Sequence, residues 1–128
     1  MKLTGNPMPT FYRIDPAQRL VLSGATGRLK LPDILDHDER LQKDPAFVPA
    51  YSQVVDMLEC TGFDFTFDDM RKLGERSVFS KESSIALVVP TDLAFGLGRM
   101  FEAFRANQNG QQVRVFRSLD EALRWAKL

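Results

Sequence analysis

The stretch Ser84–Phe104, SIALVVPTDLAFGLGRMFEAF, decides the fold of this chain. Its nearly continuous apolar run, Ile85–Val89, predicts a strand that is covered on both faces. After a proline, Thr91 and Asp92 offer side-chain oxygens suited to the start of a helix, which we expect over Leu93–Ala106. A strand, a sharp turn and a helix make up half of a βαβ unit, so the stretch predicts a parallel sheet.

The same alternation of strands and helices continues on both sides of this stretch. Residue patterns predict further strands over Phe11–Ile14, Arg19–Ser23, Gln53–Leu58 and Val113–Phe116, and helices over Pro32–Lys43, Phe67–Arg76 and around Leu119–Ala126. The order ββαβαβαβα predicts a single α/β domain, with a mixed, mainly parallel five-stranded sheet, helices packed on it and an antiparallel hairpin at one side. We expect the domain to cover residues 11–128, after a flexible lead-in over residues 1–10.

Composition narrows the class of protein. The chain has 128 residues, of which 44% are hydrophobic, enough for one domain with a substantial core. Seventeen basic and seventeen acidic side chains give a net charge of zero, which argues against a nucleic-acid binder and favours contact between copies. No apolar run approaches the roughly 18 residues of a membrane span. The single cysteine, Cys60, suits a reducing compartment, so we expect a cytoplasmic protein. From the zero net charge we expect it to form a homodimer or to bind a protein partner.

Two phrases and the alternating elements resemble a known family. The phrases are VVPTDLAFGLGRMFEAF and VRVFRSLDEALRWAKL, and the likeness to SpoIIAA-like, or STAS-like, bacterial domains covers about Tyr12 to Leu128. Such domains are related in fold to anti-sigma-factor antagonists and to lipid-binding SEC14-type domains. The resemblance implies a SpoIIAA-like sandwich and a non-enzymatic regulatory or protein-interaction module. The relation to SEC14-type domains implies the alternative, a domain that binds a small apolar or lipid-like ligand.

Thr66 is a candidate regulatory phosphosite, because the resemblance places it where anti-sigma antagonists carry a phosphorylatable serine. This chain has Asp64-Phe65-Thr66-Phe67 there, which keeps a hydroxyl but lacks the small residues and glycine of the family turn. From the residues themselves we expect Thr66 to cap a helix, with Asp69 completing a capping box. Neighbouring aspartates would also repel a phosphate. The structural cap is the favoured interpretation.

Five polar residues form a candidate cleft, because parallel strands bring their carboxyl ends to one edge of a sheet, where ligands bind in open α/β folds. They follow two of the expected strands: Asp56, Glu59, Asp64, Thr91 and Asp92. The favoured interpretation is that they cap helices and satisfy loop amides. A remote alternative is an enzyme that uses carboxylates at this edge.

The residues give little support for a metal site, a catalytic nucleophile or a dinucleotide-binding site. Asp33 and His37 are spaced i,i+4 on a helix, but no second His or Cys ligand lies near them in sequence, so no metal site is predicted. We expect the lone His37 to be solvated or salt-bridged, which weakens any Ser–His or Cys–His nucleophile. The glycines between Leu22 and Arg28 lack the third glycine of a dinucleotide site and predict a bend or bulge instead. No catalytic, metal or cofactor residue is therefore assigned.

A candidate interface lies on the helix expected over Leu93–Ala106. Gly96 and Gly98 each cost roughly 1 kcal/mol of helix propensity, which close packing on the sheet or on a second copy would offset. Arg99 lies beside them and is a candidate anchor for a partner carboxylate. Partner contact through this helix is the expectation that follows.

Overall fold

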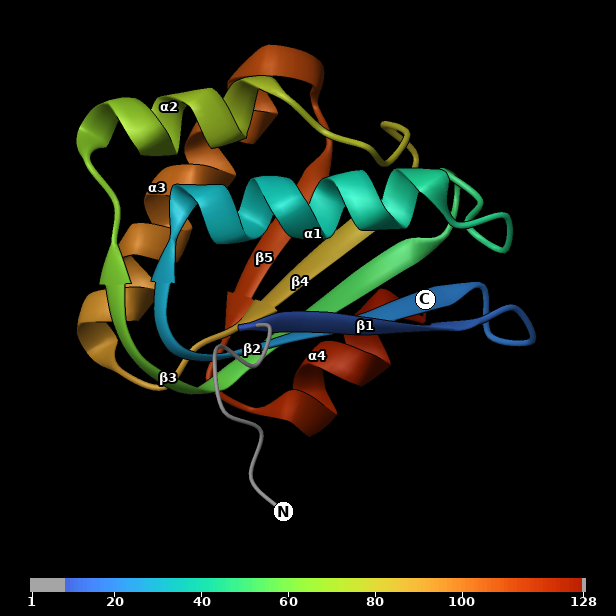
Figure 1. The fold of residues 1–128 in the computed structure, drawn as a ribbon, viewed down its shortest axis with the longest axis horizontal. Helices are drawn as coiled ribbons and strands as arrows, with labels where there is room; N and C mark the ends of the chain where they lie inside the picture. The colour runs from blue at the N-terminus through green and yellow to red at the C-terminus, as the bar shows by residue number, and fades with distance from the viewer. Residues whose placement is uncertain (1–8, 128) are drawn as a thin grey trace.

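The computed structural model describes residues 9–127, which form one α/β domain (Figure 1). Its elements are β1 (Thr10–Asp15), β2 (Leu20–Lys30), α1 (Leu31–Lys43), β3 (Ser52–Asp64), α2 (Phe67–Glu75), β4 (Ser84–Val88), α3 (Asp92–Asn109), β5 (Gln112–Phe116) and α4 (Leu119–Ala126). The predicted order ββαβαβαβα is confirmed. Residues 1–8 of the expected lead-in lie outside the described residues, and Thr10 already belongs to β1.

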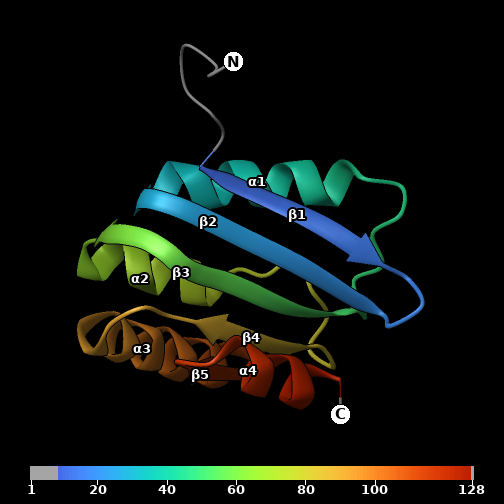
Figure 2. The same ribbon diagram turned by 90° about the horizontal axis from the view of Figure 1, so that it is seen from below.

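The five strands lie in one sheet in their chain order, as Figure 2 shows from β1 to β5. β1 and β2 pair antiparallel, and the remaining neighbours pair parallel, so the sheet is mixed and mainly parallel as predicted. Successive parallel strands are joined by α1, α2 and α3, the crossovers that such pairing requires.

Helices cover the two faces of the sheet unequally. α4 lies on one face, below the sheet in Figure 1, while α1 and α2 lie above it. Leu20, Val54 and Val88 pack with α4 on the lower face. Because side chains alternate along a strand, the residues between them face the other way, where Val21 and Ile85 pack with Leu41 of α1. Strand β4 is thus covered on both faces, as the apolar run Ile85–Val89 predicts.

Helix starts follow the sequence closely. Thr66 accepts a hydrogen bond from the backbone N–H of Asp69 at 3.0 Å, and Asp69 Oδ2 accepts from the N–H of Thr66 at 3.0 Å. This is the predicted capping box of α2. Thr91 caps α3 by accepting from Ala94 N–H at 3.1 Å, and Ser118 caps α4. α3 ends where Gly110 adopts a left-handed φ of 72°, a conformation that glycine takes without a Cβ penalty.

The main departure from the sequence prediction is the length of β2 and β3. β2 continues through the predicted bend to Lys30, and β3 continues to Asp64. Beyond Gly24 these two strands pair with each other, while the pairing of β4 with β3 ends at Asp56. Register shifts at Gly24 and Gly27 show that the glycines do mark bulges. In this two-stranded extension the backbone N–H and C=O groups of β2 and β3 bond to each other. The residue pattern of either strand alone does not predict such pairing.

Candidate functional site

A cavity of about 160 Å³ lies between the sheet and helices α1, α2 and α3. Most of its lining is apolar, with the larger side chains being Met57, Phe63, Phe65, Met70, Phe79 and Phe101. Ser23, His37 and Gln53 also line it and are buried. The charged side chains in the lining are Asp38, Arg76 and Arg105. The site is therefore a mostly apolar hollow with a small, defined set of polar groups, the usual composition of a ligand pocket.

The polar groups form one chain of hydrogen bonds. Nε2 of Gln53 lies 2.9 Å from Oγ of Ser23, and that Oγ lies 2.9 Å from Nε2 of His37. Nδ1 of His37 lies 3.0 Å from Oδ1 of Asp38. We call these four residues the polar relay. Every member but Asp38 is at least nine-tenths buried, so the hydrogen bonds of the relay lie largely away from water.

Three elements position the polar relay. Ser23 of β2 and Gln53 of β3 point to the same face of the sheet, because Gln53 pairs with Val21, two residues before Ser23. His37 comes from α1, whose start is held by Asp33: its Oδ2 accepts from the N–H of Lys30 at 2.9 Å. The ring of Tyr12 packs edge-on against His37 with centroids 5.7 Å apart. The imidazole is thus fixed between β1 and β2.

Of the two expectations for His37, solvated or salt-bridged, the structure excludes the first, because the residue is 6% exposed, and agrees with the second, because Nδ1 of His37 contacts Oδ1 of Asp38. Asp33, its i,i+4 neighbour, accepts a hydrogen bond from the backbone N–H of Lys30. Within residues 9–127, no group of three His, Cys, Asp or Glu side chains lies close enough to hold a metal ion. The signal that could have found the polar relay is a serine in β2 and a glutamine in β3 at positions that alternate with core residues. Those positions predict inward-facing polar side chains.

Arg105 of α3 lies at another part of the cavity lining and is 6% exposed. Its guanidinium donates to three carbonyl oxygens around the end of α2: Gly74 at 3.1 Å, Leu73 at 2.8 Å and Arg76 at 2.6 Å. It also bonds Oε1 of Gln111 and lies 4.6 Å from the centroid of the Phe101 ring. Burial lowers the pKa of Arg105 to about 10, and the charge of Asp38 opposes that shift. The charge sits at the negative end of the α2 dipole, which favours a cation.

The five predicted cleft residues do not come together. Asp64 lies eight positions beyond Asp56 along β3, up to roughly 26 Å at 3.3 Å per residue. Asp64 pairs with Arg28, whose guanidinium lowers the pKa of that carboxyl. Asp56 accepts from the N–H of Leu58 at 3.1 Å. In the described part of the chain no hydrogen bond or ion pair joins any two of the five.

The other members of that set have local roles or none. Thr91 caps α3, and Asp92 pairs with Arg117, which also donates to the carbonyl of Pro90 at 2.9 Å. Glu59 is exposed on β3. The long extension of β2 and β3 carries Glu59 and Asp64 away from the end of β4, which explains why the sheet edge gathers no carboxylates. Thr66 is exposed at its cap, and the regulatory phosphosite stays the less favoured hypothesis.

The two helix glycines of the predicted interface differ. A Cβ on Gly98 would lie 2.9 Å from Cγ1 of Val115, so Gly98 faces β5 and cannot contact a partner. A Cβ on Gly96 would meet no atom within 4 Å. Arg99 is exposed and pairs with Glu102 at 2.9 Å. Of the three candidate interface residues, Gly96 and Arg99 therefore lie on the outer surface of α3 and Gly98 does not.

Cys60 belongs to the core on the cavity side of the sheet. Burial, together with the nearby charge of Asp56, raises the pKa of its thiol to about 11. A thiol that keeps its proton is a poor nucleophile. Cys60 thus acts as a small apolar side chain.

Comparison with known proteins supports the fold. No protein-family model matches the chain, and no curated protein matches it. The chain is similar to the crystal structure of an uncharacterised protein of the DUF3478 family, with a SpoIIAA-like fold, from Shewanella loihica PV-4. The likeness covers 98% of this chain and 99% of that one, with a TM-score of 0.65 and 20% identity. The chain therefore has a SpoIIAA-like fold, as its phrases predict. No helix within residues 9–127 is long and apolar enough to cross a membrane.

Proposed function

We propose that this chain is a non-enzymatic domain that binds a small, mostly apolar molecule with one polar group in the cavity between the sheet and α1–α3. The observation that carries the proposal is the cavity itself, about 160 Å³ in volume, with aromatic and methionine walls beside the buried polar relay. Hydrophobic walls supply affinity for the body of a ligand, and a few fixed polar groups supply its orientation.

The volume sets the size of the ligand. An engineered apolar cavity of about 150 Å³ in another protein holds benzene, and this cavity has about the same volume. A molecule of one ring or a short chain fits such a space, whereas drug-sized ligands occupy about 300 Å³ or more. The lipid-like alternative expected from the SEC14-type resemblance is thereby narrowed to something much smaller than a phospholipid.

Thermal unfolding in the presence of toluene tests the proposal. Ligand that binds only the folded state raises the melting temperature as its concentration rises. We expect this shift for the wild type and its loss in Ala94→Leu, because Ala94 lines the cavity and a leucine there fills it. Ala122→Leu, on the opposite face, is the matched control and should keep the toluene shift.

A flat melting temperature for the wild type up to the solubility limit of toluene would contradict the proposal. Native mass spectrometry gives a second measurement on protein purified without denaturation. There we expect a minor or major species heavier than the bare chain by one small molecule. Such a species should be absent from the Ala94→Leu protein.

Hydrolysis is the competing interpretation of the polar relay, because Ser23, His37 and Asp38 have the order of a catalytic triad. Acyl transfer also needs free donors for the oxyanion. Ser23 lies inside β2 between paired partners on β1 and β3, where backbone amides serve the sheet rather than a turn or helix start. We therefore favour binding. Release of 4-nitrophenol from 4-nitrophenyl acetate should be equal for wild type and Ser23→Ala, and a loss in the variant would favour the hydrolase.

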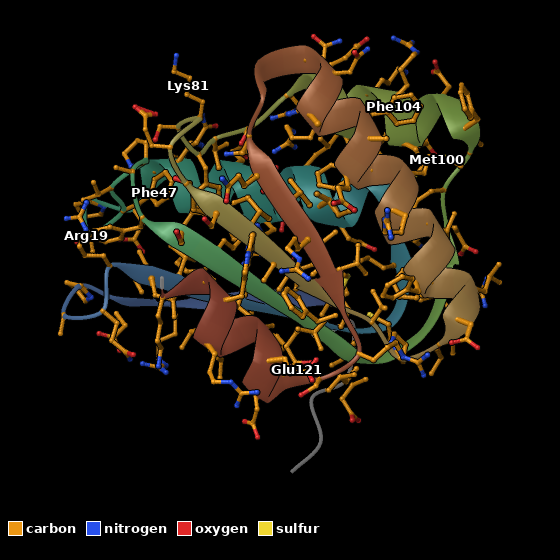
Figure 3. All side chains as sticks on the ribbon, turned by 180° about the vertical axis from the view of Figure 1, so that it is seen from behind. Arg19, Phe47, Lys81, Met100, Phe104 and Glu121 are labelled. Atoms are coloured by element: carbon orange, nitrogen blue, oxygen red, sulfur yellow. The ribbon has the colours of Figure 1, made fainter. Side chains whose placement is uncertain are left out.

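A second proposal, contact with a protein partner or a second copy, draws on exposed apolar side chains near α3. Leu93 is 79% exposed and Phe67 is 66% exposed. Met100 lies on the outer side of α3, and Phe104 lies beside α2, where it packs on Phe67 (Figure 3). Sedimentation at rising concentration tests this: Leu93→Glu should shift a wild-type dimer toward monomer. A strictly monomeric wild type would remove homodimerisation.

A further inference from the structure

We infer that the molecule bound in the cavity carries a hydroxyl group, as in a phenol or a short alcohol, and that its O–H donates to Oε1 of Gln53. The inference rests on the proposed binding function and adds the chemical class of the ligand. It follows from the direction of the hydrogen bonds in the polar relay. That direction starts at Asp38.

An ionised carboxylate accepts hydrogen bonds and donates none. Nδ1 of His37, 3.0 Å from Oδ1 of Asp38, must therefore carry a proton. In a neutral imidazole the other nitrogen, Nε2, is then an acceptor. Because Nε2 of His37 lies 2.9 Å from Oγ of Ser23, the serine hydroxyl donates to it. The first two bonds of the relay thus point toward Asp38.

A serine hydroxyl has one proton, and His37 already receives it. Ser23 can only accept from Gln53, so the amide must turn its NH₂ group toward Ser23, as the 2.9 Å contact from Nε2 requires. The orientation of this amide is therefore fixed by Asp38 through two intermediate residues. Its Oε1 is left as the remaining acceptor. Among residues 9–127 no hydrogen bond to Oε1 of Gln53 is made.

Gln53 is 8% exposed as a residue and lines the cavity, so its unpaired oxygen is available to a molecule bound there. A ligand that brings a donor satisfies it, while a ligand with only acceptors leaves Oε1 of Gln53 unpaired. The aromatic walls suit a ring, and the volume of about 160 Å³ holds one ring with a single hydroxyl.

The test compares three one-ring probes that differ in one group: phenol donates, benzonitrile only accepts, and toluene does neither. Their dissociation constants are measured by calorimetry or by ligand-observed NMR on the full chain at pH 8. For the wild type we expect phenol to bind about tenfold or more tightly than toluene, and benzonitrile no better than toluene. Gln53→Met keeps the volume and removes the acceptor, so phenol and toluene should bind equally.

Ser23→Ala tests the direction of the relay with a milder change. Without the serine the Gln53 amide can rotate and present NH₂ to the cavity. We expect the affinity for benzonitrile to rise while the preference for phenol falls.

The outcomes separate the two proposals. Equal binding of phenol and toluene to the wild type would overturn the inference and leave cavity binding standing. Tighter binding of benzonitrile than of phenol would overturn it as well, because the relay would then run the other way. If none of the three probes binds the wild type, the proposed function itself fails.

Discussion

The two faces of the sheet contrast in how they are packed. On the α4 face, Ala86, Val88 and Ala122 are fully buried in a cluster of apolar side chains. On the α1–α3 face, the same strands border a cavity of about 160 Å³ and present Ser23 and Gln53 to it. Protein interiors are normally close-packed and apolar, so a hollow that carries buried polar groups is the unusual feature.

This contrast separates a close-packed face from the face where we propose that a ligand binds. One short helix closes the α4 face, with small alanines that let it approach the strands. Three helices cover the other face, where large side chains line the cavity. Arg105 of α3 joins the end of α2 through three hydrogen bonds to carbonyl oxygens, which we call the Arg105 clamp. Each prediction below changes one side of the contrast.

The largest effect is expected from Arg105→Met. The change removes a buried cation from three backbone carbonyls, which would be left without these donors. We expect the free energy of unfolding to fall by about 3 kcal/mol, measured by urea denaturation. Arg99→Met, on the exposed side of the same helix, should leave it nearly unchanged. A loss below about 1 kcal/mol for Arg105→Met would mean that the clamp does not hold α2.

A matched pair of buried helical alanines compares the faces directly. Ala122 is 0% exposed in the close-packed core, and Ala94 is 3% exposed beside the cavity. Ala122→Leu should lower the free energy of unfolding by about 2 kcal/mol through overpacking. Ala94→Leu should cost less than half as much, because the added atoms enter empty space. Equal losses of unfolding free energy in the two variants would mean that the leucine side chain at position 94 does not fit into the cavity.

The glycines of α3 give a smaller pair of effects. Gly98→Ala places a Cβ against Val115, and we expect the free energy of unfolding to fall by about 1 kcal/mol. Gly96→Ala meets no atom, so the gain in helix propensity should raise it by about 0.5–1 kcal/mol. If Gly96→Ala also weakens self-association, α3 packs against a second copy at that glycine. Chemical denaturation and sedimentation of the same samples supply both measurements.

Cys60 gives the smallest effect and tests whether water reaches the cavity-side core. A thiol pKa of about 11 against an ordinary 9.0 leaves about a hundredfold less thiolate at pH 8. Modification by a disulfide reagent should be slower than in the urea-unfolded chain by at least that factor. The same shift means that stability declines as pH rises from about 9 through about 11, because the unfolded thiol ionises first. Rapid modification of the folded protein would show that this core is open.

Sequence patterns predicted the layout of the molecule because strands and helices are set by local periodicity and caps. Thr66 with Asp69 is an example, since both groups lie within one turn. The extent of β2 and β3 was missed, because it depends on pairing between two distant segments.

The polar relay was missed for the same reason. Ser23, His37 and Gln53 come from three elements, and only the fold brings polar atoms of His37 and of Gln53 each within 2.9 Å of Oγ of Ser23. The residues of the predicted cleft show the opposite case: they are near in sequence to the expected strand ends, but the long β2–β3 extension places Asp64 far along β3 from Asp56. Long-range placement, rather than residue type, decided both outcomes.

The most direct measurement of cavity binding is a crystal structure of the protein soaked with 4-bromophenol, in which the anomalous signal of bromine locates the ring. The account predicts a bromine peak between the sheet and α1–α3, with the phenol oxygen within hydrogen-bond distance of Oε1 of Gln53, and no peak on the α4 face. An empty cavity, or a peak only at the protein surface, would contradict it.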